Sequence, residues 1–187
     1  MDDFKPLETG GSAAGYARWE GWINRGGLAE YARRRNNALQ VQGVSRMSAY
    51  LNLGMVSPSR LTRDAVARAG GGGGCQKYLD EFHTWRELSY GHCFHAPETH
   101  RTVRGLPQWA QATLRRHAGD ARAKHVTLEN LAAGKSGHDV WDAMQECLIQ
   151  RGELHNNARM TWGKQLLGRG LHSSNVQLNI RRFSHTF

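Results

Sequence analysis

Apolar residues recur at helical spacing along nearly the whole chain, and no stretch of five or more residues alternates cleanly between apolar and polar positions. This pattern predicts helices and argues against a sheet. The expected fold class is therefore all-α, a helical bundle in a single domain. We expect a helix that opens at Ser57-Pro58, with Ser as the N-cap, and further helices at residues 11–24, 27–35, 45–53, 77–94, 107–117, 139–151 and 156–167.

Glycine residues mark the expected breaks between these helices. Gly26-Gly27 separates the first two, and Gly152 fits the C-cap of the helix at 139–151. The run from Gly70 to Gly74 predicts a flexible loop, because five consecutive glycines cannot hold a helix. From about residue 169 the chain is polar and shows no face to pack, so we expect a disordered tail at 169–187.

Composition narrows the class of protein. The chain has 187 residues and 39% hydrophobic residues, and its 22 glycines bring the apolar share into the globular range, which excludes wholesale disorder. No apolar run approaches the roughly 18 residues of a membrane span. Cys75, Cys93 and Cys147 lie far apart without a CxxC motif, which favours an intracellular reducing compartment over a disulfide framework or structural zinc.

Charge points to a polyanionic partner. Lys and Arg number 25 against 16 Asp and Glu, so the net charge is +9. Nucleic acid is the commonest partner of such a chain, and a solvated basic surface is the alternative. His92 and His95 share a helical face, but Cys93 points elsewhere and no second ligand cluster follows, so we expect no metal.

Two motifs near the N-terminus combine basic and hydroxyl side chains. The segment from Tyr31 to Asn36 holds three arginines, which are also typical of an ordinary basic helix end. Ser45 and Ser48 flank Arg46 where a helix is expected to begin, and the free N–H groups, hydroxyls and helix dipole there suit a diphosphate. Simple N-capping by Ser45 is the alternative.

A third motif places an acid beside an indole. Glu81 and Trp85 are four residues apart and share a helical face. A carboxylate next to an indole suits recognition of the edge and flat surface of a base. The alternative is a surface ion pair between Glu81 and Arg86, with Trp85 half-buried beside it.

A fourth motif runs from His155 to Lys164. Asn156, Arg159 and Gly163 lie on one face of the expected helix. A buried Arg at this position needs an anionic partner. The sequence does not assign that partner to a particular helix.

Together with the segment around Trp141, these motifs resemble the FAD-binding helical domain of the photolyase/cryptochrome family. The resemblance runs from about Gly10 to Lys164, so we expect a partial domain of this type at residues 1–168. The step from Glu81 to Trp85 is more similar to the branch found in plants and algae. In order, the motifs are Y-x-x-x-R-N, S-R-M-S-x-Y-L-x-x-G-x-x-S, D-E-x-x-x-W-R-E-L, W-D-A-M-Q and G-E-L-H-N-N-x-R-M-x-W-x-K.

The resemblance implies bound FAD and light-driven repair, in which excited reduced flavin passes an electron to a pyrimidine dimer flipped out of DNA. It implies catalytic roles for Glu81 and Asn156. The implied FAD-binding residues are Tyr31, Ser45, Arg46, Met47, Ser48, Asn156 and Arg159. The implied DNA-binding residues are Arg35, Glu81, Trp85, Arg86, Asn156 and Asn157.

The chain also departs from the family. Nothing corresponds to the family's N-terminal α/β domain or to the later helices that carry an aspartate pair and relay tryptophans. From this we expect weak FAD binding or none, and impaired lyase activity. Two alternatives remain, a cryptochrome-type blue-light photoreceptor and a flavin-free DNA-binding helical fragment. The expected partner is DNA with pyrimidine dimers, and we expect a monomer without a membrane or metal partner.

Overall fold

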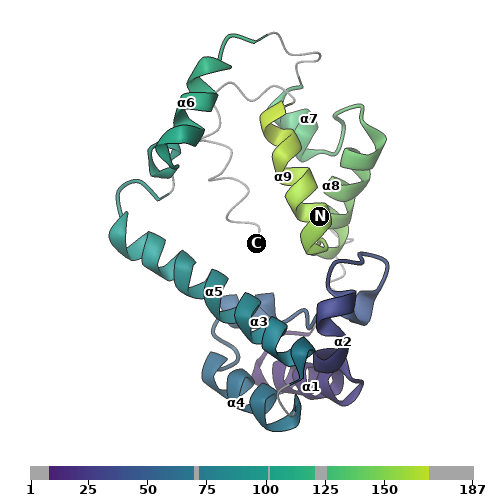
Figure 1. Ribbon diagram of the computed structural model, residues 1–187. Coiled ribbons are helices and arrows are strands. Elements are labelled where there is room, and N and C mark those ends of the chain that lie inside the picture. The colour runs from purple at the N-terminus through teal and green to yellow at the C-terminus, as the bar shows by residue number, and fades with distance from the viewer. Residues whose placement is uncertain (1–8, 70–71, 101, 121–125, 169–187) are drawn as a thin grey trace. The chain divides into compact units, whose positions relative to one another are not determined.

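The computed structural model describes residues 9–69, 72–100, 102–120 and 126–168 (Figure 1). Within these ranges all regular elements are helices, which confirms the all-α prediction, and the expected tail at 169–187 lies outside them. The 3-10 helices are η1 (Val41–Gly43) and η2 (Val103–Gly105). The α-helices are α1 (Ser12–Asn24), α2 (Gly27–Arg34), α3 (Ser48–Asn52), α4 (Pro58–Ala69), α5 (Gly73–His95), α6 (Gln108–Arg116), α7 (Leu128–Ala132), α8 (Asp139–Arg151) and α9 (Asn156–Gly168).

The chain divides into two compact units, and each is described by itself. The N-terminal unit runs from Glu8 to Ser89, and the C-terminal unit holds the described residues from Tyr90 onward, so the boundary falls within α5. The sequence pattern predicted one domain, and the assignment of residues 1–168 as one partial domain stays a prediction. None of the helices in the described ranges combines the length and apolarity that crossing a membrane requires.

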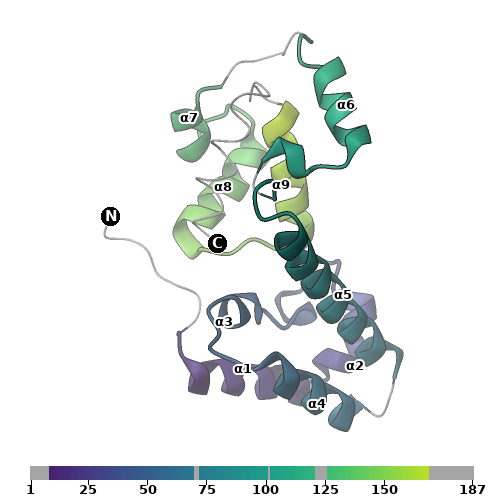
Figure 2. The ribbon, with the colours of Figure 1, turned by 90° about the vertical axis from the view of Figure 1, so that its left-hand side faces the viewer.

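An aromatic cluster forms the core of the N-terminal unit. The rings of Trp19, Trp22 and Tyr78 lie 5.4–5.6 Å apart, and both indoles are almost fully buried. Each indole also finds a polar partner, because Trp19 Nε1 donates to Asp64 at 3.3 Å and Trp22 Nε1 donates to the Gln42 carbonyl at 2.9 Å. Burying an aromatic side chain of this size contributes about 2–3 kcal/mol. This core joins α1, α2, α4 and the first half of α5, and Figure 2 shows α1 running beside α4.

The predicted glycine loop is wrong for its last two residues. Helix α5 begins at Gly73, and Gly74 is buried in its first turn. A Cβ on Gly74 would lie 2.3 Å from the carbonyl oxygens of both Leu28 and Ala29, so only glycine lets α5 approach the backbone of α2 this closely. Gly74 therefore serves helix packing, which a count of consecutive glycines does not reveal.

The helix expected at 45–53 is shorter than predicted. Helix α3 starts only at Ser48, and its N-cap is Met47, which makes no side-chain capping bond. The interpretation of Ser45 as an N-cap is therefore wrong, since Ser45 precedes the helix by three positions. Pro58 does open α4, and the Ser57 hydroxyl accepts a long hydrogen bond of 3.4 Å from the Arg60 backbone N–H, as the sequence predicted.

The C-terminal unit has a smaller core around two stacked indoles. The Trp141 and Trp162 rings are 6.0 Å apart and nearly parallel, at 7°. Trp141 Nε1 donates to the Trp162 carbonyl at 3.1 Å, and Trp162 Nε1 donates to Gln145 Oε1 at 3.0 Å. Helix α8 ends at Gly152 in the left-handed conformation, as the sequence predicted. Helix α7, which the sequence pattern did not predict, packs beside α8.

Candidate functional site

The acid and the indole of α5 lie side by side in the N-terminal unit. Trp85 Nε1 donates a hydrogen bond of 3.0 Å to Glu81 Oε2, which confirms that the two side chains share a helical face. The Trp85 ring is 63% exposed, so its flat surface is available to a planar partner. Arg86, the next residue of α5, is half-buried.

Two cations hold the Glu81 carboxylate. Arg35, which follows α2, lies 3.0 Å from Glu81 Oε1, and Lys77, one turn earlier on α5, lies 2.8 Å from the same oxygen. Partial burial favours the neutral acid, but the bonds and charges of Lys77, Arg35 and Trp85 outweigh it and lower the pKa of Glu81. Glu81 is therefore ionised at neutral pH and can only accept hydrogen bonds.

Two tyrosines link this cluster to the hydroxyl-rich loop. The Arg35 guanidinium lies 5.8 Å from the centre of the Tyr31 ring, and the Tyr31 and Tyr78 rings meet edge to face at 5.2 Å. Burial raises the pKa of Tyr78, which lies in the same core cluster as Met47 of this loop. Contacts therefore connect the loop to Glu81 through side chains of a single unit.

The backbone of the loop Ser45–Ser48 can hold an anion. Arg46 is the one non-glycine residue in the described ranges with positive φ, at 56°, and Met47 follows at φ −85° and ψ −3°. A left-handed residue beside a right-handed one turns successive backbone N–H groups toward a common concave face, which binds anions. Met47 is buried and Ser48 is exposed at the mouth of this turn. The residues present fit a diphosphate, which is the anionic part of FAD.

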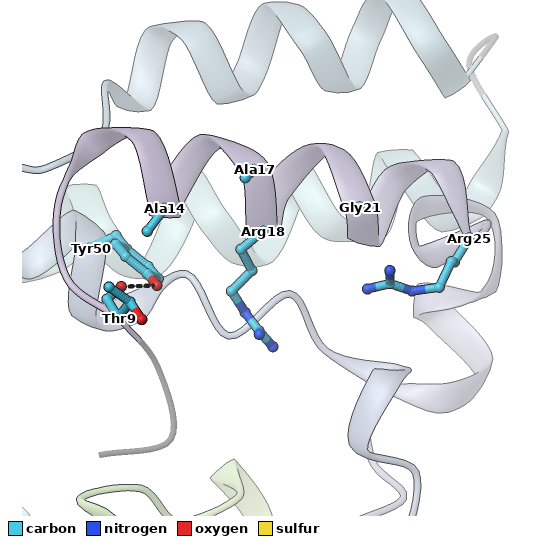
Figure 3. A pocket seen from close by; sticks show the side chains of 7 residues that line it. All are labelled: Thr9, Ala14, Ala17, Arg18, Gly21, Arg25 and Tyr50. Carbon is cyan, nitrogen blue, oxygen red and sulfur yellow. Dashed lines mark hydrogen bonds between the residues drawn. The ribbon is translucent and has the colours of Figure 1, made fainter. Parts of the chain in front are cut away.

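A pocket of about 290 Å³ lies along α1 beside this loop (Figure 3). Arg18 and Arg25 point into it from α1, and the Tyr50 hydroxyl donates to the Thr9 carbonyl at 2.7 Å on its other side. Arg18 Nε also donates to the Ser45 carbonyl at 3.1 Å. This guanidinium therefore both lines the pocket and contacts the loop Ser45–Ser48 (the anion loop).

The other predicted residues lie on α9, in the C-terminal unit. Arg159 Nη2 donates to Asn156 Oδ1 at 3.0 Å, which confirms that these two side chains share a face. Arg159 is exposed, so the expected buried arginine in need of an anionic partner is not found. Asn157 is exposed as well, and its backbone N–H donates to His155 Nδ1 at 3.3 Å.

The structure thus brings five of the predicted residues into one connected cluster, namely Tyr31, Arg35, Met47, Glu81 and Trp85. Sequence reasoning missed three residues that hold this cluster together. Lys77 lies four positions before Glu81, so the i,i+4 rule could have found it. Arg18 contacts Ser45 across 27 positions of sequence, and Tyr78 shares the core cluster with Met47 across 31 positions, and no local pattern indicates either relation.

No metal centre is found in the part of the chain that the structure describes. No group of three or more His, Cys, Asp or Glu side chains there could hold a metal ion. The three cysteines are free thiols.

Comparison with curated proteins gives matches to photolyases. Over 141 residues the chain is 32% identical to the deoxyribodipyrimidine photo-lyase of Arabidopsis thaliana, which covers 75% of this chain and 28% of that protein. Over 137 residues it is 34% identical to the deoxyribodipyrimidine photo-lyase of Methanothermobacter thermautotrophicus, which covers 73% and 29%. The chain therefore spans less than a third of the length of these relatives. No model of a known protein family matches the chain.

Solved structures share the fold. The chain superposes on a bacterial class III photolyase from Agrobacterium tumefaciens with a TM-score of 0.64 at 20% identity, covering 96% of this chain and 38% of that one. The Synechocystis sp. PCC6803 cryptochrome gives a TM-score of 0.61 at 18% identity, covering 100% and 40%. At these identities the likeness shows the fold alone.

Proposed function

The chain belongs to the photolyase/cryptochrome family, and we propose that it contributes FAD-holding and DNA-facing helices to a deoxyribodipyrimidine photolyase. One observation carries the proposal. An anion loop and an exposed acid–indole pair lie in one compact unit, joined by the contacts from Met47 through Tyr78 and Tyr31 to Arg35 and Glu81. A photolyase needs both features near each other, because the cofactor must face the lesion.

The proposed cofactor contacts begin at the loop. Backbone N–H groups of the S-R-M-S segment receive the diphosphate of FAD, and Tyr31 contributes from α2. For Asn156 and Arg159, on α9 of the C-terminal unit, the proposed flavin contact rests on the family resemblance alone. When bound, reduced flavin supplies an electron after it absorbs light. Each hydrogen bond from a loop N–H group to the charged diphosphate contributes about 1.5–3 kcal/mol. A few such bonds correspond to weak FAD binding, with a Kd of about 0.1 mM.

The proposed DNA contacts use the other end of the cluster. Trp85 offers an exposed ring on which a flipped base can stack, which contributes about 1–3 kcal/mol per base. Glu81, held ionised by Arg35 and Lys77, accepts a hydrogen bond from the base edge. Arg35, Arg86 and Asn157 are proposed to contact DNA near the lesion, and the net charge of +9 favours the approach of the duplex.

Binding to an oligonucleotide with one thymine dimer tests this proposal. Wild-type protein should bind the damaged duplex at least tenfold more tightly than the undamaged one, and Trp85→Ala should remove most of that preference. Trp109→Ala is the matched control, because Trp109 is also exposed but lies in the C-terminal unit. Equal affinity for both duplexes, or an equal effect of the two substitutions, would contradict the proposal.

Two other functions fit the same family and charge. A cryptochrome-type photoreceptor would keep the cofactor residues and show no light-dependent loss of thymine dimers when reduced FAD is added. A flavin-free DNA-binding module would follow from the charge of +9 alone. It would bind both duplexes equally, with steep salt dependence and no response to flavin.

A further inference from the structure

Two side chains of helix α1 donate hydrogen bonds to the backbone that leads into the anion loop. Arg18 and Trp22 are four residues apart and therefore share a face of α1, and Arg25 is the C-cap residue of the same helix. Arg18 Nε donates to the Ser45 carbonyl at 3.1 Å and Trp22 Nε1 to the Gln42 carbonyl at 2.9 Å. Arg25 instead contacts a side chain, the Gln42 amide oxygen, at 3.3 Å.

The hydrogen bond from Arg18 to the Ser45 carbonyl also fixes the direction of the N–H group in the same peptide unit. A trans peptide unit is planar, and its carbonyl and N–H point in opposite directions. Because Arg18 holds the Ser45 carbonyl toward α1, the N–H of Arg46 must point away from α1. The bond therefore orients the first N–H of the anion loop.

The loop needs such an anchor, because its conformation is unfavourable by itself. A non-glycine residue in the left-handed region costs about 1–2 kcal/mol, and Arg46 occupies that region with φ of 56°. The other end of the loop is held by packing, because Met47 is buried in the same core cluster as Tyr78 of α5. The loop is thus held at the Ser45 carbonyl by α1 and at the Met47 side chain by the core.

We propose that Arg18 is a positioning residue that holds the loop Ser45–Ser48 in its anion-binding conformation before a diphosphate ligand arrives. This inference rests on the proposed function for the identity of the ligand, the diphosphate of FAD. A loop ordered in advance loses less conformational entropy on binding, so its anchors raise the affinity without contacting the ligand.

Amide hydrogen exchange followed by NMR tests the anchors directly. In Arg18→Gln, the amides of residues 46–48 should exchange at least tenfold faster than in wild type, while those of α4 keep their rates. Arg25→Gln is the control, since it removes the same charge from the C-cap of the same helix but no bond to a backbone carbonyl.

Binding of inorganic pyrophosphate and of FAD then tests two claims separately: that Arg18 anchors the loop, and that FAD is the ligand. Pyrophosphate should shift the resonances of residues 46–48 in wild type, and Arg18→Gln should weaken that binding at least fivefold, whereas Arg25→Gln should stay within twofold. If pyrophosphate behaves this way and FAD does not bind, the anchoring stands and the proposed cofactor is wrong. If pyrophosphate does not shift the loop, or if Arg18→Gln leaves its exchange within twofold of wild type, the inference is overturned.

Discussion

Replacement of Gly74 by alanine sharply tests the packing that supports the candidate site. Viewed as part of a flexible glycine run, this position should tolerate alanine, which stabilises a compatible site by about 0.4–1 kcal/mol. The structure predicts the opposite sign. Gly74 is buried in the first turn of α5, where that helix meets the backbone of α2.

The magnitude follows from the contacts of the added methyl group. A Cβ on Gly74 would lie 2.3 Å from two carbonyl oxygens, those of Leu28 and Ala29. Real Cβ atoms essentially never come within 3.0 Å of such atoms, and here the neighbours are backbone that cannot rotate away. Overpacking of this kind costs about 3 kcal/mol, at the upper end of the usual range. In a unit of 60–100 residues, this corresponds to a fall in Tm of roughly 15 °C.

The assay is urea unfolding followed by circular dichroism and Trp fluorescence, with Gly73→Ala as the control. Gly73 lies one residue earlier, is exposed, and has no atom within 4 Å of its added Cβ. Gly73→Ala should therefore be neutral or stabilising by about 0.5 kcal/mol. Equal stability of the two variants, or stabilisation by Gly74→Ala, would refute the close approach of α5 to α2.

Two further predictions concern single side chains. Glu81→Gln should lower the free energy of unfolding at pH 7 by about 1 kcal/mol, because it removes a partly buried ion pair with Arg35. Folding lowers the pKa of Glu81, so the ionised carboxylate contributes fully to stability above its ordinary pKa near 4.5, and this contribution is lost as the pH falls below that value. Urea unfolding at pH 7 and pH 3 should therefore show a difference in unfolding free energy between wild type and variant that disappears in acid. Gln145→Ala should lower the free energy of unfolding by about 1–3 kcal/mol, because it leaves the buried Trp162 N–H without its acceptor. A smaller loss, measured by thermal unfolding, would mean that water replaces the amide.

Local features of the fold could be predicted from the sequence. The bounds of α8 and its glycine C-cap followed from apolar spacing and from Gly152. The hydrogen bond between Glu81 and Trp85 followed from their spacing on one helix. These features depend on residues within one or two turns of each other, which the helical period places directly.

Contacts between distant segments could not be predicted. The pair Arg35–Glu81 joins positions 46 residues apart, and its formation depends on how α5 packs against α2. The start of α5 was missed for the same reason, since Gly74 is helical because of its packing partners and against its own propensity. The left-handed Arg46 also follows from tertiary anchors, which a single sequence does not show.

Titration of the chain with FAD and with riboflavin, followed by flavin fluorescence, tests the central claim most directly. The two ligands share the ring system, but only FAD carries the diphosphate that the loop Ser45–Ser48 is proposed to hold. We predict a Kd for FAD of about 0.1 mM, and riboflavin binding at least tenfold weaker, which corresponds to about 1.4 kcal/mol from the diphosphate contacts. Equal affinities for the two ligands, or no FAD binding at about tenfold that concentration, would contradict it.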